Sequence, residues 1–167
     1  QKIVDGIVKS LGAFMKSKKI TVLDGLGTLG ANRTVTVQHP DGSSSTVVGT
    51  NVILASGSVP RTIPGFEPAP PGQHGPVMTS DEVLMLSSLP ARVAVIGGIG
   101  CEFASTFADL GAQVTILEGL PKILPGLDTD VANVVVRSFK KKNIDIKTGV
   151  KVLGHTPNGS GGTTVHF

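Results

Sequence analysis

The sequence lacks the residues that mark several common classes of protein. Its 167 residues include no tryptophan, no tyrosine and a single cysteine. One cysteine excludes a disulfide framework within the chain and a cysteine-rich zinc site. The absence of tryptophan and tyrosine removes the aromatic surfaces on which bases of single-stranded nucleic acid stack. Because the net charge is only +3 as well, we expect no nucleic-acid partner.

Long apolar runs are also missing. No run approaches the roughly 20 residues that a membrane span needs, so we expect no membrane partner. Hydrophobic residues still make up 40% of the chain, which suffices for a buried core and excludes a disordered chain. The 22 glycines and 11 prolines predict many turns between short elements. The length fits one domain of about 150 residues, or two partial domains of a longer protein.

The first third of the chain predicts one helix and a small antiparallel sheet. Apolar residues recur at helical spacing through residues 1–16. Strand-like segments follow at residues 20–23, 33–38 and 46–55. Pro40-Asp41-Gly42 has the composition of a turn between the second and third segments. The run Val52-Ile53-Leu54-Ala55 is apolar throughout, which is typical of a strand buried on both faces.

A proline-rich segment separates this part from the rest. Six prolines lie within residues 59–76, a density that no regular element tolerates, so we expect a domain boundary there. The residues Thr79-Ser80-Asp81-Glu82 then supply capping groups for a short helix.

From residue 91 onward the pattern alternates strands with helices. Strands are expected at residues 93–96, 114–117 and 144–146, and helices at 102–110 and 128–142. This βαβαβ order predicts a parallel sheet and a partial Rossmann-type α/β domain. Residues 163–167 have the pattern of one more strand, and the sequence does not begin with methionine. We therefore expect a segment of a longer protein.

Two glycine-rich segments are candidates for a dinucleotide-binding loop. The literal fingerprint G-x-G-x-x-G occurs at residues 25–30. That motif works when a helix begins at the loop and directs its amide groups at a pyrophosphate. Here an alternating strand pattern follows at residues 33–37, and no acidic residue ends a second strand about 20 residues later. We expect a turn within the sheet instead.

The second segment, Gly97-Gly98-Ile99-Gly100, has an imperfect motif in the right context. A buried strand precedes it, a helix follows, and Glu118 ends the next strand. Glu118 could accept hydrogen bonds from both hydroxyls of an adenosine ribose, and its charge would repel a 2′-phosphate. These residues predict binding of NAD(H) in preference to NADP(H). The alternative is an ordinary tight turn beside a surface glutamate.

Around this loop the sequence resembles a known family. Residues 95–104, V-I-G-G-I-G-C-E-F-A, are similar to the NAD-binding loop of the flavoprotein disulfide reductases, and the dihydrolipoamide dehydrogenases are the most similar members. Three further segments resemble the same family in the same order: residues 53–58, 79–84 and 119–128. The resemblance covers nearly the whole chain.

The resemblance implies an FAD-binding part at the start of the chain. Residues 1–58 would be a β-meander segment of an FAD-binding domain, followed by a connection over residues 59–76. Gly27 matches a sheet glycine whose backbone meets the FAD adenine. Ser56 and Gly57 match the crossover residues beside the flavin nucleotide.

Residues 77–167 would then be an NAD-binding domain, truncated at its C-terminus. The resemblance implies six NAD-binding residues, which are the loop glycines, the ribose ligand and two further contacts: Gly97, Gly98, Gly100, Glu118, Glu102 and Val150. Glu102 matches a glutamate near the contact of nicotinamide and flavin. Val150 matches a backbone contact to the NAD adenine.

The resemblance further implies the activity of the whole protein. It would oxidise dihydrolipoamide with FAD and NAD⁺, as a homodimer that serves 2-oxoacid dehydrogenase complexes in the cytoplasm. Other NAD-linked members of the family, such as a transhydrogenase, an NADH oxidase or a mercuric reductase, remain alternatives. A non-catalytic NAD(H)-binding module is a further alternative.

The chain departs from the family pattern in two ways. The family loop has the form G-G-G-x-I-G-x-E, whereas Gly98 is joined directly to Ile99 here. Either the loop is two residues shorter, or two residues are missing from the sequence at this point. The family's redox pair C-x-x-x-x-C is also absent, because Cys101 is the only cysteine. We expect no catalytic residue, no catalytic histidine and no metal site in this chain, and we interpret Cys101 as a packed core thiol.

Overall fold

The computed structural model describes residues 2–70, 73 and 75–167 of the chain. Contacts divide them into two compact units, one ending at Gly57 and the other beginning at Ser58. Each unit is described by itself. No helix among the described residues is both long enough and apolar enough to cross a membrane.

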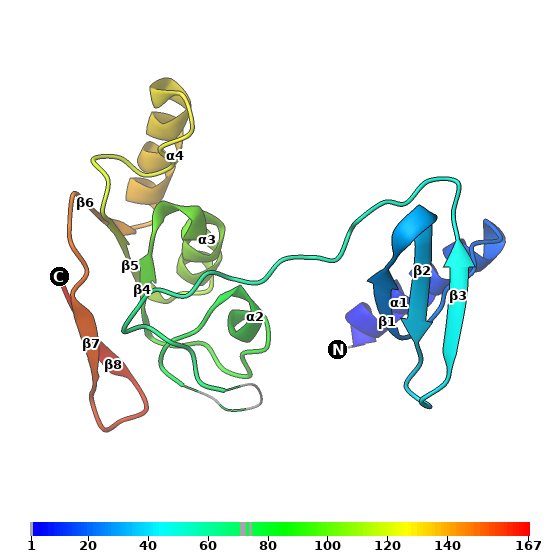
Figure 1. Ribbon diagram of the computed structural model, residues 1–167. Coiled ribbons are helices and arrows are strands. Elements are labelled where there is room, and N and C mark those ends of the chain that lie inside the picture. Colours follow the sequence, from blue (N-terminus) through cyan, green and yellow to red (C-terminus); the bar gives the residue numbers. More distant parts are fainter. Residues whose placement is uncertain (1, 71–72, 74) are drawn as a thin grey trace. The chain divides into compact units, whose positions relative to one another are not determined.

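The first unit contains the expected helix and an antiparallel meander (Figure 1). Its elements are α1 (Lys2–Ser17), β1 (Leu26–Leu29), β2 (Thr34–Gln38) and β3 (Ser44–Val48). The strands follow one another in the order β1-β2-β3. The predicted turn between β2 and β3 is confirmed: Gly42 has φ +84, and the Asp41 carboxylate accepts a hydrogen bond from the Ser43 N–H at 2.9 Å.

The literal glycine fingerprint forms a strand rather than the expected turn. Leu26–Leu29 is β1, in which Gly27 lies opposite Val37 of β2. A side chain at Gly25 would collide with the carbonyl oxygen of Gln38, so the close approach of β2 explains that glycine. A short 3-10 turn and β2 follow, and no α-helix begins at the segment.

The expected strand at residues 20–23 is absent, and the strand expected at residues 46–55 ends with β3 at Val48. Residues 52–55 have no regular secondary structure, and the side chains of Ile53 and Leu54 are 88% and 75% exposed. A strand buried on both faces lies inside a sheet and is covered by other elements on both faces of that sheet. Within the described part of this unit, β1, β2 and β3 pair only with one another, so the apolar run has no place in the sheet.

The second unit has the predicted alternation of strands and helices (Figure 1). Its main elements are α2 (Ser80–Val83), β4 (Arg92–Ile96), α3 (Cys101–Asp109), β5 (Gln113–Glu118), α4 (Thr129–Lys141) and β6 (Asp145–Thr148). Strand β5 pairs in parallel with β4 on one side and with β6 on the other. The βαβαβ prediction is therefore confirmed. A hairpin of β7 (Gly154–Pro157) and β8 (Thr163–His166) follows, of which the sequence predicted only the second strand.

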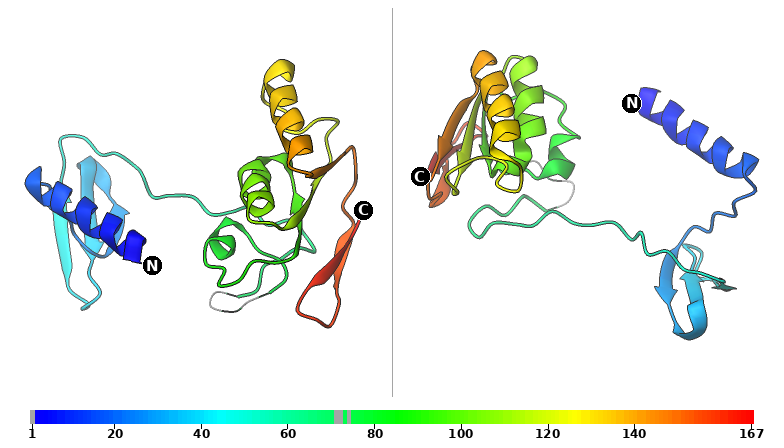
Figure 2. Two further views of the ribbon diagram at one scale, coloured as in Figure 1. Left: turned by 180° about the vertical axis from the view of Figure 1, so that it is seen from behind. Right: turned by 90° about the horizontal axis from the view of Figure 1, so that it is seen from above.

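The core of this unit lies between the sheet and the helices. Helices α3 and α4 lie on the same face of the sheet (Figure 2). Val114 and Ile116 of β5 are 1% and 0% exposed, and they pack with Phe107 of α3 and Phe139 of α4. Strand β5 is thus buried as predicted. Strand β4 is only half-buried because it is an edge strand whose single neighbour is β5.

The short helix α2 begins at the predicted cap. The Thr79 hydroxyl accepts a hydrogen bond from the Asp81 N–H, and the Glu82 carboxylate accepts from the Thr79 N–H at 2.6 Å. This reciprocal arrangement is a capping box. The Thr79 hydroxyl also donates to the Glu82 carboxylate at 2.7 Å, and this bond, together with the one from the Thr79 N–H, lowers the pKa of Glu82 because both favour the ionised form.

The packing of α3 against β4 predicts a specific effect of a single methyl group. A side chain at Gly100 would collide with Cγ1 of Val95, and valine has little freedom to move away. We expect Gly100→Ala to destabilise the second unit by about 1–3 kcal/mol. Urea unfolding followed by far-UV circular dichroism measures this, because the chain lacks tryptophan.

Gly126→Ala is the matched control, since a side chain at Gly126 meets nothing within 4 Å. The same loss of stability in both variants would contradict the packing argument.

Candidate functional site

The candidate site begins where β4 turns into α3. Gly97 has φ +90, a conformation that favours glycine. Its N–H donates to the carbonyl oxygen of Leu117 in β5 at 2.9 Å, and the Gly100 N–H donates to the Gly97 carbonyl at 3.2 Å. Residues Gly98–Gly100 form a single 3-10 turn that runs directly into α3. Gly98 is joined directly to Ile99, two residues fewer than in the family pattern.

The Glu118 carboxylate lies against this turn. Glu118 is the last residue of β5 and is only 9% exposed. One carboxylate oxygen accepts the N–H of Gly98 at 2.7 Å, and the other accepts the N–H of Leu120 at 2.8 Å. These are charge-assisted hydrogen bonds, which are shorter and stronger than neutral ones. They join the turn after β4 to the segment after β5.

The same carboxylate explains why residue 98 is glycine. A side chain at Gly98 would lie 3.1 Å from the nearer Glu118 oxygen and 3.1 Å from the Leu124 nitrogen. Both distances are tighter than ordinary van der Waals contact. Gly98 is buried. The sequence did not predict that Leu120 and Leu124 contribute to this site. Their backbone nitrogens make the contacts, and backbone contacts leave no pattern in the side chains.

The structure brings one further predicted residue to this cluster. The Val150 N–H donates to the carbonyl oxygen of Glu118 at 3.2 Å, so the chain after β6 passes beside the end of β5. Glu102 lies in the first turn of α3 with its side chain exposed. Five of the six residues predicted for NAD therefore lie at or next to the turn and the Glu118 backbone, and Glu102 follows on the helix.

The residues predicted for FAD lie in the first unit. Gly27 is in β1, and a side chain there would make only an ordinary contact of 3.6 Å with Val35. Ser56 and Gly57 lie exposed in the segment after β3 that has no regular structure. Gly57 has φ +81. Strand packing therefore does not require glycine at 27, whereas the local backbone favours it at 57.

Cys101 is buried beside the turn. It is 7% exposed, and its thiol donates to the carbonyl oxygen of Gly98 at 2.7 Å. Burial raises the pKa of the thiol, and the negative charge of Glu118 raises the pKa further. The thiol therefore stays protonated at neutral pH, which confirms its interpretation as a core thiol.

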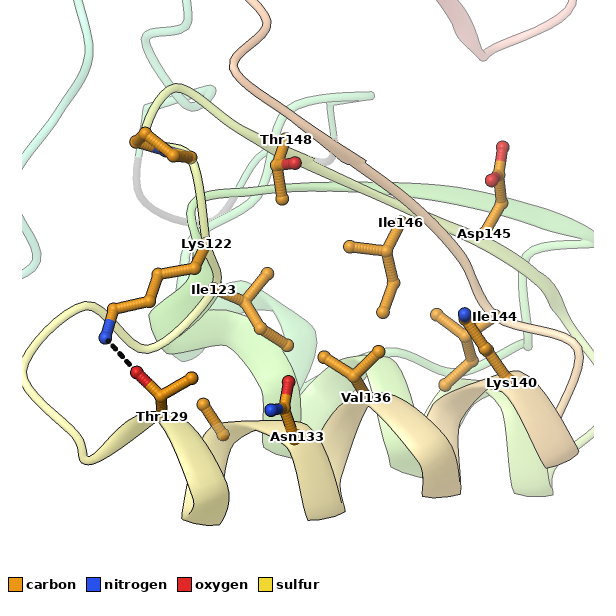
Figure 3. A pocket seen from close by; sticks show the side chains of 12 residues that line it. Lys122, Ile123, Thr129, Asn133, Val136, Lys140, Ile144, Asp145, Ile146 and Thr148 are labelled. Atoms are coloured by element: carbon orange, nitrogen blue, oxygen red, sulfur yellow. Dashed lines mark hydrogen bonds between the residues drawn. The ribbon is translucent and has the colours of Figure 1, made fainter.

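A separate pocket lies between α4 and β6. It has a volume of about 420 Å³ and is lined by α4, β6 and the segment 121–123. Figure 3 shows Lys122 at one end, where its amine donates to the Thr129 hydroxyl at 3.3 Å. No residue predicted for NAD or FAD lines this pocket.

The turn accommodates only part of a dinucleotide. A carboxylate has about four lone-pair positions, and internal hydrogen bonds to the Glu118 side chain use two of them, so ribose hydroxyls could still be accepted. The N–H groups of Gly97, Gly98 and Gly100 are each already hydrogen-bonded within the chain. Glu118 therefore keeps acceptor positions for ribose hydroxyls, whereas the N–H groups of the three glycines are not free for a pyrophosphate.

Comparison with known proteins relates this arrangement to one family. The sequence profile described as "Pyridine nucleotide-disulphide oxidoreductase" matches residues 4–166. A dihydrolipoyl dehydrogenase of Chlorobaculum parvum is 36% identical over 146 residues, which is 86% of this chain and 30% of the relative. A dihydrolipoamide dehydrogenase of Chaetomium thermophilum is 34% identical over 164 residues, which is 96% and 32% of the two chains.

Solved structures give the same result. The crystal structure of LpdA from Mycobacterium tuberculosis matches with a TM-score of 0.79 and 26% identity, over 98% of this chain and 36% of that one. The HOCl-induced flavoprotein disulfide reductase RclA of Escherichia coli matches with a TM-score of 0.62 and 28% identity, over 88% and 32%. The chain spans about a third of the length of the relatives it matches.

The environment of Cys101 predicts slow chemistry at its thiol. The thiolate is the form of cysteine that attacks an alkylating reagent, and the raised pKa of the Cys101 thiol keeps the thiolate scarce. At pH 8, we expect iodoacetamide to modify the folded chain at least about tenfold more slowly than the chain unfolded in guanidinium chloride. Mass spectrometry follows the reaction, and equal rates in the two states would contradict the burial of this thiol.

Proposed function

Because the chain belongs to the pyridine nucleotide-disulphide oxidoreductase family, we propose that it forms the central part of a flavoprotein of the dihydrolipoyl dehydrogenase type. The whole protein would oxidise dihydrolipoamide to lipoamide and reduce NAD⁺ to NADH. The two thiols of dihydrolipoamide lose two electrons and two protons; NAD⁺ takes up a hydride, and one proton is released. FAD, when bound, would transfer the electron pair between the two substrates.

The proposal assigns the two units to different cofactors. Residues 1–58 contribute to FAD binding, residues 59–76 connect, and residues 77–167 form the NAD-binding part. The division of contacts between Gly57 and Ser58 supports the first boundary. Gly27 supports the FAD assignment, because packing does not require glycine there, and a bare backbone on an exposed strand admits a flat ring.

One observation most strongly supports the assignment of the second unit to NAD. The carboxylate of Glu118, at the carboxyl end of β5, lies within hydrogen-bonding distance of the glycine turn that begins α3. In α/β sheets a dinucleotide binds at this edge, and an acid in this position accepts the ribose hydroxyls. Gly97, Gly98, Gly100 and Val150 would lie beside the bound nucleotide, and Glu102 would lie towards the nicotinamide.

The assignment of Glu118 predicts selectivity between nucleotides. A 2′-phosphate would place negative charge beside this carboxylate, so NADPH should bind at least about tenfold more weakly than NADH. Glu118→Gln keeps one oxygen acceptor and removes the charge, and it should narrow the difference. Nucleotide fluorescence measures both affinities in a chain without tryptophan.

Asp130→Asn, which removes an exposed charge in the first turn of α4, is the matched control and should leave the ratio unchanged. If the wild-type chain binds NADPH as well as NADH, the ribose assignment is wrong.

The partners of the whole protein follow from the same proposal. They are dihydrolipoamide carried on 2-oxoacid dehydrogenase complexes and a second copy of the protein in a homodimer. The proposed location is the cytoplasm. A non-catalytic NAD(H)-binding module is the second candidate function, and the single cysteine of the chain favours it. A C-x-x-x-x-C pair upstream in the complete transcript would decide for the enzyme.

The chain by itself should not oxidise dihydrolipoamide. Its one cysteine cannot form the redox pair that the family uses, so electrons have no route from the dithiol. We expect no NADH formation above the buffer rate when dihydrolipoamide and NAD⁺ are mixed with the chain and free FAD. Absorbance at the NADH band measures this, and a rate that increases with protein concentration would overturn the expectation.

A further inference from the structure

The glycine turn differs from a pyrophosphate-binding loop in the state of its donors. In this fold, backbone N–H groups at the loop and at the start of the helix bind the pyrophosphate. Here the Gly97 N–H donates to Leu117, the Gly98 N–H donates to Glu118, and the Gly100 N–H donates to Gly97. The three glycine donors of the turn are thus used within the chain.

Breaking the hydrogen bond of the Gly98 N–H, so that this group could bind a phosphate, would be unfavourable. The Gly98 N–H lies 2.7 Å from a carboxylate oxygen, and a charge-assisted bond of this kind is among the stronger protein hydrogen bonds. A phosphate taking its place would also lie close to the negative charge of Glu118, and the repulsion would be strong because Gly98 and Glu118 are both buried.

The space around the turn opposes the pyrophosphate as well. The position that a side chain would take at Gly98 lies 3.1 Å from the Leu124 nitrogen and 3.3 Å from the Ile123 Cα. Ile123 is 1% exposed, so this segment is anchored in the core. The family pattern has two more residues between Gly98 and Ile99, and the shortened turn enters α3 directly.

We propose that the shortened turn of this chain retains adenosine recognition through Glu118 but has lost pyrophosphate binding. Its affinity for a complete dinucleotide would then come from the adenosine half. This inference depends on the proposed function, because it takes Glu118 as the ribose ligand.

A ligand series separates the two halves of the site. Adenosine contains only the ribose and adenine, whereas ADP-ribose adds the pyrophosphate without the nicotinamide. By calorimetry, we expect the wild-type chain to bind ADP-ribose within about threefold of its affinity for adenosine. Inserting Gly-Ala between Gly98 and Ile99 should strengthen ADP-ribose binding at least about tenfold and leave adenosine binding unchanged.

The same Gly-Ala insertion between Gly159 and Ser160, in the turn between β7 and β8, is the matched control and should change neither affinity. Circular dichroism checks that each variant folds. If the Gly98 insertion does not fold, hydrogen exchange on the wild-type chain still tests the inference. The Gly98 amide should exchange slowly, and ADP-ribose should not change its rate.

The outcomes distinguish this inference from the proposed function. If wild-type ADP-ribose binding is at least about tenfold tighter than adenosine binding, the turn binds pyrophosphate and the inference is wrong. The ribose assignment would then still stand. If neither wild-type nor insertion variant binds adenosine or ADP-ribose, Glu118 is not a ribose ligand and both the inference and the proposed NAD site fail.

Discussion

The hydrogen bond between the Gly98 N–H and the Glu118 carboxylate organises the candidate site. It joins the turn after β4 to the end of β5, and the second carboxylate oxygen holds the Leu120 N–H in the following segment. A buried carboxylate without such donors would be unstable. The bond therefore fixes the turn, the glutamate and the next segment as one structure, and any ligand at this edge of the sheet has to be compatible with it.

This interaction also relates stability to function. The two backbone donors stabilise the carboxylate in the position where it could meet a ribose, but one of them is then lost to a pyrophosphate. The buried Cys101 thiol adds a contact to the Gly98 carbonyl. A loop with two more residues would have additional N–H groups, so that one could donate to Glu118 and others to a pyrophosphate. The short turn of this chain has to use the same N–H group for one purpose or the other.

The two units differ in how far their apolar residues are buried. In the second unit, β5 and two helices enclose a core in which Ile116 is fully buried. In the first unit, Val37 is the buried apolar side chain among the described residues, while Ile53 and the apolar face of α1 are exposed. The apolar pattern of residues 52–55 predicted a buried strand, whereas Ile53 and Leu54 are exposed. Burial as a strand depends on neighbouring elements, and the described residues supply none beside this run.

The sequence by itself determined the alternating βαβαβ order, the cap at Thr79, and the position of Glu118 after a buried strand, because periodicity and capping are local properties of the chain. It also favoured Gly97–Gly100 over the literal motif as the candidate dinucleotide loop, because a helix pattern follows only the former, and the structure has that helix. Only the tertiary structure decided that residues 26–29 pair as a strand, that β4 is half-buried at an edge, and that the Gly98 donor is taken by Glu118. These features depend on which segments of the chain pair and pack with one another. The backbone groups that take part are the same at every position, so they leave no pattern in the sequence.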